Sequence, residues 1–543
     1  MDNNLLAELL YPEIKTLPAD MEARFPARNL PEGAKVTRFA PSPTGFLHIG
    51  NLYGAFTDER LAHTSGGVFL LRIEDTDAKR TVDNGVAIII ETLKKLGVVF
   101  DEGATIDGDN GDYGPYRQSE RAEIYQTYAK QLVREGKAYP CFCTEEELSA
   151  IRERQEEQKL TPGYYGEFAV WRDAPIEKVK EKLEAGAPFV LRFRSEGNSN
   201  NKLKFNDQIK GDIDVTENDI DHVMLKSDGI LTYHFAHAVD DHLMGTTHVV
   251  RDESWLSTLP FHIQLFKALG FKMPKFCHTA QVLKLDNGNK RKISKRKDPE
   301  AALTFYHSQG YPVSAVREYL MTLLNSNFEE WRLANPDAPI EDFKFTTKKM
   351  SVSGSLFDLD KLNDVSKNVI SRMTADEVYD QTLVWAKEND EEFAKILEND
   401  REYAVRILSI GRGGKKPRKD IALWSEVKNY MSFFYDELFK PVDAIPESFD
   451  KSDVKAVLEA FKTSYDESVE QSEWFNNIKA IAEQCGFCPD MKQYKADPSA
   501  FKGSVADVSM FLRVAVTGRM NSPDLYEVMQ ILGKDRVLAR VSE

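Results

Sequence analysis

The sequence predicts an α/β fold: a parallel sheet made of βαβ units, interrupted by an α+β insertion and followed by an all-helical region. Three observations carry this prediction. Short apolar runs alternate with amphipathic stretches as far as residue 112, mixed strands and charged helices replace that rhythm from 113, and helical periodicity dominates after 370. Strands that alternate with helices at this spacing are typical of parallel sheets, because each parallel strand needs a crossover connection.

The first half of the sheet follows from four elements in a row. Val36 to Ala40 is a short apolar run stopped by prolines, and Val68 to Ile73 is nearly continuous in apolar residues, as expected for a strand buried on both faces. Helices are predicted after each strand, at 48–64 and 84–96, because apolar residues recur on one face and glycines stop both patterns.

The other parts are predicted from changes in that rhythm. Residues 1–32 are expected to form a helix over 4–10 and otherwise a surface arm. The insertion should hold charged helices at 121–135 and 145–159 and a strand at 189–193. Alternation returns from about 231, and the region after 370 is helical with loops at 411–419, 440–448 and 486–491.

Composition narrows the class of protein. A net charge of −16 argues against non-specific coating of nucleic acid. No apolar run approaches the roughly 20 residues that cross a bilayer, and the N-terminus lacks the pattern of a secretory signal. Five cysteines in 543 residues do not make a disulfide framework. We therefore expect a cytoplasmic protein without a membrane partner.

The first candidate site lies where a predicted strand meets a predicted helix, at Pro41 to Asn51. Backbone N–H groups and the helix dipole favour a phosphate at such a junction. Gly45 and Gly50 have the spacing of a Walker loop, but the Lys and Ser or Thr of that motif are absent. His48, on the first helical turn, can instead donate to a phosphate oxygen. Taken alone, His48 is equally compatible with an ordinary helix start.

The second candidate site is a lysine-rich loop, Lys292-Ile293-Ser294-Lys295-Arg296. Six of the eight residues from Lys290 to Lys297 are Lys or Arg. Lysines three apart on a mobile loop can follow a phosphate as charge builds on it and stabilise a leaving pyrophosphate. A solvated basic loop is the alternative, so this interpretation depends on the two segments occurring together.

The two segments together resemble the two signatures of class I aminoacyl-tRNA synthetases, and further segments resemble the bacterial-type glutamyl-tRNA synthetases. The similar segments are Arg38 to Gly45, Arg72 to Asp77, Tyr113 to Arg121, Val239 to Gly245, and the tail from Leu512 through Lys534 to Arg540. The resemblance covers residues 35 to 543, and chance does not account for agreement over so many separate segments.

The resemblance implies a function for each part of the chain. It implies a Rossmann-like catalytic domain in two halves, residues 33–112 and 233–284. Between the halves, residues 113–232 would form an insertion that binds the tRNA acceptor end. Residues 285–370 would hold the lysine signature loop and contact the tRNA stem, and residues 371–543 would bind the anticodon.

The implied reaction has two steps. The glutamate α-carboxylate attacks the α-phosphate of Mg-ATP, and the terminal ribose of tRNA then takes the glutamyl group. No side chain becomes covalently attached in this family, so positioning and charge stabilisation supply the rate. The implied cofactors are ATP and Mg²⁺, the expected state is a monomer, and tRNA(Glu) is the implied partner, with tRNA(Gln) left open. The implied catalytic residues are His48, Gly50, Lys292 and Lys295, and the implied ATP-binding residues add Thr44, Gly45, Asn51 and Ser294.

The implied glutamate pocket needs a cation for the γ-carboxylate and an anion for the α-ammonium. Arg38 and Arg251 are expected to bind the carboxylate, because a guanidinium can grip it with two hydrogen bonds. Glu74 and Ser42 are expected on the ammonium side, although an ion pair between Arg38 and Glu74 is the structural alternative. The remaining expected residues are Ala40, Tyr233 and His237, the last of which stands where relatives have Asn or another small or polar residue.

The sequence does not predict a protein-bound metal. Cys141-Phe142-Cys143 occurs where some relatives hold a structural zinc, but the two further ligands such a site needs are missing through Asp173. Cys485 and Cys488 are expected to be incidental. Asp240-Asp241-His242 is expected at a strand end, as polar scaffolding or an ATP contact.

A second basic cluster falls in the implied anticodon region. Five of the eight residues from Arg412 to Lys419 are basic, and Arg can stack on single-stranded bases and hydrogen-bond to them. The expected tRNA-binding residues are Arg412, Lys415, Lys416, Arg418 and Lys419. A solvated loop is the alternative.

Three other functions are weighed against this one. Glutaminyl-tRNA synthetases typically carry β-barrel anticodon domains, which the helical pattern after 370 opposes. A tRNA-modifying paralogue lacks an anticodon domain, whereas about 170 residues follow position 370. A catalytically dead tRNA-binding protein would show damage to His48, Gly50, Lys292 or Lys295, and all four are in place.

Overall fold

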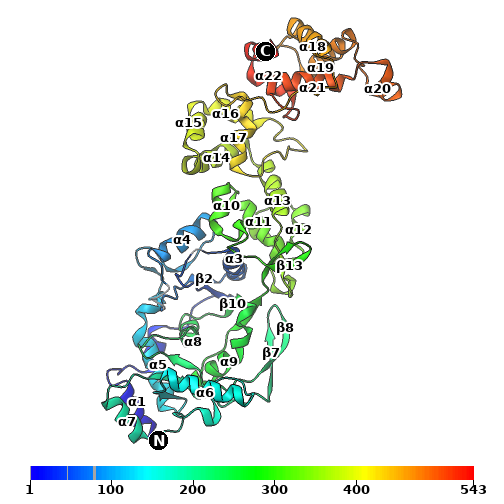
Figure 1. The fold of residues 1–543 in the computed structure, drawn as a ribbon. Coiled ribbons are helices and arrows are strands. Elements are labelled where there is room, and N and C mark those ends of the chain that lie inside the picture. The colour runs from blue at the N-terminus through cyan, green and yellow to red at the C-terminus, as the bar shows by residue number, and fades with distance from the viewer. Residues whose placement is uncertain (1, 46, 77–80, 543) are drawn as a thin grey trace. The chain divides into compact units, whose positions relative to one another are not determined.

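The computed structural model describes residues 2–45, 47–76 and 81–542. Phe46 and Asp77, which belong to two of the segments above, lie outside the described residues. The chain divides into two compact units. The first comprises Met1–Phe305 and Arg317–Asp358, and the second comprises Tyr306–Val316 and Leu359–Glu543 (Figure 1).

The predicted βαβ unit forms the centre of the first unit. Strands β1 (Val36–Phe39) and β2 (Val68–Leu71) pair in parallel, and helix α3 (Ile49–His63) connects them. β2 also pairs in parallel with β3 (Glu102–Ala104) after helix α4 (Gly85–Lys95), and β4 (Asp109–Asn110) closes the edge antiparallel. Phe69, Leu70 and Leu71 are fully buried, as the continuous apolar run predicts.

The sheet resumes after the insertion. Helix α8 (Tyr233–Leu243) leads to β10 (His248–Asp252), which pairs in parallel with β11 (Lys275–Thr279) across 3-10 helix η3 (Glu253–Thr258) and helix α9 (Leu259–Leu269). The backbone N–H of Thr247 donates to the Val36 carbonyl at 2.9 Å, so β10 lies beside β1. Segments more than 200 positions apart therefore lie side by side, with β10 and β11 as a two-stranded sheet next to the four-stranded sheet β1–β4, in the second half predicted from the returning alternation.

The insertion between these halves mixes helices and antiparallel strands. Its elements are η1 (Gln118–Glu120), α5 (Ala122–Arg134), β5 (Ala138–Cys141), α6 (Glu145–Glu157), η2 (Gly166–Phe168), α7 (Ile176–Glu184), β6 (Val190–Phe193), β7 (Lys202–Asp207), β8 (Gly211–Thr216) and β9 (Val223–Leu225). β6 pairs antiparallel with β5 and β9, and β7 and β8 form a separate hairpin.

The helix expected over 4–10 is confirmed as α1 (Asn3–Leu10), but the residues that follow are only partly a surface arm, because 18–24 form a second helix, α2 (Pro18–Arg24). Leu6, Met21 and Phe25 are buried in the core shared with α5. The ammonium group of Lys130 is buried too, and it donates to the carbonyls of Tyr11 at 3.0 Å and Ile14 at 2.8 Å. The polar, proline-rich composition concealed this docking, because only a few widely spaced apolar side chains make the contact.

The lysine-rich segment belongs to a small sheet. β12 (Val282–Asp286) pairs antiparallel with β13 (Asn289–Lys292) and parallel with β14 (Ser355–Leu356). The elements between β13 and β14 are η4 (Pro299–Ala301), α10 (Leu303–Gln309), α11 (Val313–Leu324), α12 (Phe328–Ala334), η5 (Ile340–Asp342) and η6 (Thr347–Lys349).

The second unit is helical, as the periodicity after 370 predicts. Its further elements are α13 (Leu359–Arg372), α14 (Ala375–Asn389), α15 (Glu391–Asn399), α16 (Arg401–Ser409), α17 (Trp424–Met431), η7 (Ser432–Phe434), α18 (Lys451–Ser464), α19 (Gln471–Gln484), α20 (Met491–Ala496), η8 (Pro498–Ala500), α21 (Val505–Thr517), α22 (Leu525–Leu532) and α23 (Lys534–Ser542). Their apolar faces share one core, in which Phe393, Phe434 and Phe511 are fully buried. Within the described residues no helix is both long and apolar enough to span a membrane.

Candidate active site

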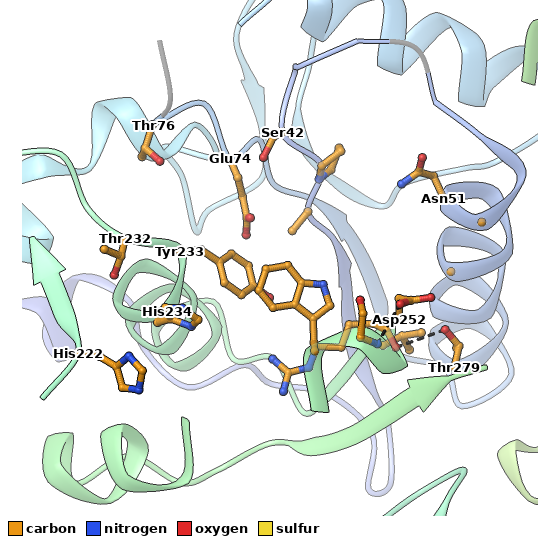
Figure 2. A pocket seen from close by; sticks show the side chains of 18 of the residues that line it. Ser42, Asn51, Glu74, Thr76, His222, Thr232, Tyr233, His234, Asp252 and Thr279 are labelled. Atoms are coloured by element: carbon orange, nitrogen blue, oxygen red, sulfur yellow. Dashed lines mark hydrogen bonds between the residues drawn. The ribbon is translucent and has the colours of Figure 1, made fainter. Parts of the chain in front are cut away.

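A cavity of about 1210 Å³ opens in the first unit, at the ends of β1, β2 and β10 (Figure 2). Polar ends of neighbouring parallel strands meet there, which is where α/β sheets bind ligands. Eleven of the residues predicted from the sequence line it: Arg38, Ala40, Ser42, His48, Gly50, Asn51, Glu74, Tyr233, Arg251, Lys292 and Lys295. Thr44, Gly45, His237 and Ser294 lie outside this lining.

His48 and Asn51 cap helix α3 reciprocally. The His48 Nδ1 accepts the Asn51 backbone N–H at 3.3 Å, and the Asn51 Oδ1 accepts the His48 backbone N–H at 3.0 Å. Burial and the nearby lysines, Lys295 and Lys292, lower the pKa of His48 to about 4. The imidazole is therefore neutral, and because Nδ1 accepts, its proton sits on Nε2. His48 is both a helix cap and a donor on the cavity wall.

Gly50 is required by this arrangement. A Cβ at this position would lie 2.9 Å from Cε1 and 3.0 Å from Nδ1 of the His48 ring. Contacts this short force a side chain to move, so any larger residue would turn the imidazole away from its capping position. The sequence predicts Gly50 as a catalytic residue, and the structure adds its close approach to the His48 ring.

The lysine loop is tethered at its base. The Arg291 guanidinium donates to both carboxylate oxygens of Asp298, at 2.7 and 2.8 Å, and the Ser294 backbone N–H donates to Asp298 at 2.8 Å. Lys292 and Lys295 both line the cavity. This tether was not predicted from the sequence, although Asp298, seven residues after Arg291, was a visible signal.

Glu74 lies just beyond β2, and its carboxylate faces the same space as Tyr233 and Ser42 (Figure 2). The Arg72 Nη2 donates to it at 3.3 Å. Burial raises the pKa of Glu74 to about 7, because Arg72 and Arg38 only partly offset the loss of water. An ion pair between Arg38 and Glu74 was the structural alternative; instead Glu74 pairs with Arg72.

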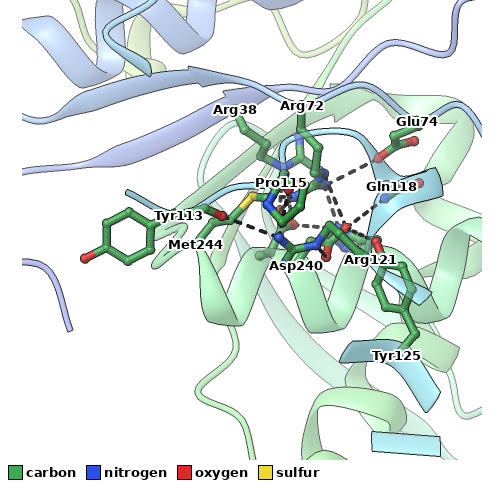
Figure 3. Close-up of polar contacts among 12 residues, drawn as sticks. Arg38, Arg72, Glu74, Tyr113, Pro115, Gln118, Arg121, Tyr125, Asp240 and Met244 are labelled. Atoms are coloured by element: carbon green, nitrogen blue, oxygen red, sulfur yellow. Dashed lines mark hydrogen bonds and ion pairs between the residues drawn. The ribbon is translucent and has the colours of Figure 1, made fainter. Parts of the chain in front are cut away.

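Arg38 is already paired inside the protein. Its Nε donates to Asp241 at 3.0 Å, and Asp241 also accepts from Arg72 Nη1 at 2.7 Å. Beside it, Asp240 accepts from Arg121 Nε at 2.7 Å (Figure 3). Gln118 and Tyr125 also donate to Asp240, at 2.9 and 2.8 Å.

Asp240 and Asp241 lie in helix α8 and not at a strand end, so that part of the prediction is wrong. The strand end was predicted because α8 is buried on most of its surface and lacks the solvent-facing side by which an amphipathic helix is recognised. Their predicted role as polar scaffolding is confirmed by the contacts above. His237, expected to contact glutamate, is fully buried and lies 2.6 Å from Asp241 through Nδ1.

Arg251 differs from Arg38 in having no acidic partner. Its Nε and Nη1 meet the imidazoles of His278 and His262, each at 2.9 Å. Its Nη2 is buried without a hydrogen bond, and no carboxylate of the described residues forms an ion pair with it. Arg251 therefore lines the cavity as a guanidinium that has one nitrogen without a hydrogen bond and no carboxylate at ion-pair distance.

Several lining residues were not predicted. Trp255 lies on η3 with its ring centroid 4.4 Å from that of Tyr233, and Asp252 and Thr279 line the wall near the end of β10 (Figure 2). An aromatic residue four positions after Arg251 was the one visible signal for this part of the wall.

The cysteine pair predicted not to bind zinc contacts a tyrosine. The sulfurs of Cys141 and Cys143 lie 3.4 and 3.5 Å from the Tyr164 hydroxyl, and both cysteines are free thiols. Cys485 and Cys488 are free as well. Across residues 2–45, 47–76 and 81–542, no group of three or more His, Cys, Asp or Glu side chains could hold a metal ion.

The basic cluster in the second unit divides into two kinds of residue. The Arg412 guanidinium donates to the carbonyls of Leu408 and Ile370, at 2.7 and 2.6 Å, and so holds helix ends together. Arg418 pairs with Asp420. Lys415, Lys416 and Lys419 are exposed.

Comparison with known proteins places the chain in a family. Residues 35–364 match tRNA synthetases class I (E and Q), catalytic domain, and residues 498–543 match an anticodon binding domain. The chain is 53% identical over 542 residues to a glutamate–tRNA ligase of Acetivibrio thermocellus, covering 100% of this chain and 99% of that one. It is 47% identical to the corresponding ligase of Clostridium perfringens, over 99% of each. A crystal structure of a glutamate tRNA ligase from Elizabethkingia meningosepticum in complex with its amino acid superposes with a TM-score of 0.72 at 28% identity, covering 94% of this chain and 98% of that one.

Proposed function

The chain belongs to the glutamate–tRNA ligases, class I tRNA synthetases, and on this premise we propose how its cavity activates glutamate with ATP and charges tRNA. The observation that carries the proposal is the composition of one cavity wall. A buried carboxylate, Glu74, and an uncompensated guanidinium, Arg251, share the cavity with His48, Lys292 and Lys295. A zwitterionic amino acid with a second carboxylate and a polyphosphate together need this set of charges.

Glutamate binds between opposite charges. Glu74 takes the α-ammonium, and the Arg251 guanidinium, which lines the cavity and whose buried Nη2 has no hydrogen bond, takes the γ-carboxylate. Arg38 is the weaker candidate for this role because Asp241 already neutralises it. Arg38 adds positive electrostatic potential to the pocket, and Tyr233 and Ser42 form part of its wall.

ATP binds toward the start of α3 and the lysine loop. The Nε2–H of His48 donates to a phosphate oxygen, and Lys292 and Lys295 stabilise the charge that passes to pyrophosphate. Mg²⁺ arriving with ATP would spread phosphate charge and needs few protein ligands. The α-carboxylate of glutamate attacks the α-phosphate, the bond to pyrophosphate breaks, and no side chain of the protein is bonded covalently.

The tRNA partner is tRNA(Glu). The insertion at 113–232 is proposed to hold its acceptor end, and the exposed lysines at 415, 416 and 419 its anticodon side. Phosphate contacts by lysine make such binding sensitive to salt.

Aminoacylation with labelled glutamate tests the proposal. The full chain should charge purified tRNA(Glu), and Lys295→Ala should lower kcat by about 10²–10³ with unchanged thermal stability. A parallel assay with tRNA(Gln) shows whether charging extends to it. Absence of both pyrophosphate exchange and charging with ATP, glutamate and tRNA(Glu) present would overturn the enzymatic function in favour of a tRNA-binding protein.

A further inference from the structure

Arg251, on β10, lies at the centre of a hydrogen-bonded chain drawn from five elements. Its Nε donates to Nε2 of His278, on β11, and its Nη1 meets Nδ1 of His262, on α9, both at 2.9 Å. His278 continues through Nδ1 to Asp207 at 2.7 Å. His262 continues through Nε2 to Nδ1 of His234 at 2.8 Å. Two of the three guanidinium nitrogens are therefore held by imidazoles.

The tautomer of each histidine follows from this chain. A guanidinium has only donors, so each imidazole nitrogen that meets it must accept. His278 therefore carries its proton on Nδ1 and donates to Asp207, whereas His262 carries its proton on Nε2 and donates to His234. His234 accepts at Nδ1 and carries its own proton on Nε2. Every hydrogen bond in the chain then has one donor and one acceptor.

Asp207 fixes the outer end of the chain. Its Oδ1 accepts the backbone N–H groups of Ile209 at 2.9 Å and Lys210 at 2.8 Å, while Oδ2 accepts from the His278 imidazole at 2.7 Å and from the His278 backbone N–H at 3.2 Å. The carboxylate is almost fully buried at the end of β7. The insertion hairpin therefore holds His278, and His278 holds Arg251.

Both imidazoles beside Arg251 are neutral. Burial lowers the pKa of His262 well below its usual value and also lowers the pKa of His278. The charged and titratable groups that face the two rings are Tyr233, His234, His237 and Asp241 from α8, Arg251 from β10, and Asp207 and Lys210 from the β7–β8 hairpin.

We propose that His278 and His262 are positioning residues that aim Arg251 at the substrate carboxylate and select a carboxylate over an amide. Neutral imidazoles satisfy two guanidinium nitrogens without cancelling the charge, so the missing negative charge must come from the ligand. A carboxylate supplies it, and the amide of glutamine does not. Arg38 is the counterexample within the same cavity, because Asp241 cancels its charge. This inference rests on the proposed binding of glutamate by Arg251.

The test compares two substitutions at each histidine in the full chain. His278→Phe and His262→Phe keep a ring of similar size and remove the acceptor. His278→Gln restores an acceptor near the Nε2 position, and His262→Asn restores one near the Nδ1 position. KM and kcat for glutamate, ATP and tRNA(Glu) are measured by aminoacylation, together with inhibition by glutamine.

Each Phe variant should raise the KM for glutamate by about tenfold or more, the usual effect of losing a hydrogen bond to a charged group. The ratio of the inhibition constant of glutamine to the KM for glutamate should fall. KM for ATP should stay within about twofold, and the Gln and Asn variants should recover most of the glutamate affinity. His248→Phe is the matched control. His248 lies on β10, three residues before Arg251, and takes no part in the hydrogen bonds around Arg251, so this substitution should leave KM for glutamate unchanged.

A double-substitution cycle separates this inference from the proposed function. In an Arg251→Lys background, His278→Phe should add little, because its effect passes through Arg251. An equal effect of His278→Phe in both backgrounds would overturn the positioning role. If Arg251→Lys itself left KM for glutamate unchanged, the proposed role of Arg251 in substrate binding would be wrong. If Arg251→Lys raised KM but neither Phe variant did, only the inference would fail.

Discussion

The two units of the chain bury different kinds of side chain. In the first unit, buried charged residues surround the cavity, with Arg38, Arg72, Asp240 and Asp241 all nearly inaccessible to solvent. In the described part of the second unit, Arg540 is the one buried charged residue, and the core is otherwise apolar with a few hydroxyl groups. A site that binds charged substrates needs charged side chains that are shielded from water and held in fixed positions. A helical unit, in contrast, can fold on apolar packing alone. The first unit should therefore be the more sensitive to charge and pH.

The largest loss of stability should come from removing a buried carboxylate that is shared by two arginines. Asp241→Ala leaves the guanidinium groups of Arg38 and Arg72 without their shared carboxylate, at a cost of about 3–5 kcal/mol of unfolding free energy. Hydrogen exchange should show faster opening of peptides from the first unit, with those of the second unchanged. Asp436→Asn, which removes an exposed partner of Arg540, should cost less than about 1 kcal/mol. Equal destabilisation by both changes would contradict the contrast between the units.

As the pH falls, the first unit should lose stability before the second. Of the ten histidines, only His307 lies in the second unit, and burial lowers the pKa of His237 to about 4. Burial likewise lowers the pKa of the histidines at 222, 234 and 248 to about 4.

A folded pKa below the unfolded value means that the unfolded chain binds more protons, so stability is present above pH 6.5 and is lost as pH falls toward 4. His237 alone should cost roughly 2 kcal/mol between pH 7 and 5. Hydrogen exchange at these two pH values, corrected for intrinsic rates, should show loss of protection confined to the first unit. Parallel loss in both units would refute this assignment.

Glutamate binding should weaken as the pH falls through 7. Burial raises the pKa of Glu74 to about 7, and an α-ammonium group favours the ionised carboxylate, so binding should release a proton from Glu74. Between pH 8 and 6 the KM for glutamate should rise by about tenfold. Calorimetric titrations in buffers of different ionisation enthalpy would measure the proton released. In Glu74→Gln, affinity should be lower and this pH dependence absent.

The smallest effects should come from the basic cluster at 412–419. Lys415→Ala with Lys416→Ala should change stability by less than about 0.5 kcal/mol and should raise the KM for tRNA(Glu), with a shallower dependence on salt. Arg412→Ala should instead lower the stability of the second unit by about 1–3 kcal/mol, because it removes the hydrogen bonds from the guanidinium to the carbonyls of Leu408 and Ile370. If Arg412→Ala changed only tRNA binding, its structural role would be disproved.

Local sequence patterns were enough to predict much of the fold and part of the candidate site. Continuous apolar runs predicted β1 and β2, and helical periodicity predicted the second unit, because both depend on neighbours in sequence. His48 and the lysine loop were found for the same reason. The contacts that decide what Arg38 and Arg251 can do join residues far apart in sequence. Arg38 meets Asp241 across 203 positions, and His278 meets Asp207 across 71.

The cap at the start of α3 bears on how an inhibitor could engage this cavity. Since Nδ1 of His48 is occupied by the Asn51 backbone and the ring is neutral, the available group is an N–H and not a cation. A compound designed to place a carboxylate against an imidazolium would find no charge there. A neutral hydrogen-bond acceptor, such as a sulfonyl or carbonyl oxygen, suits His48 better, while an acidic group on the same compound belongs opposite Lys295 or Arg251.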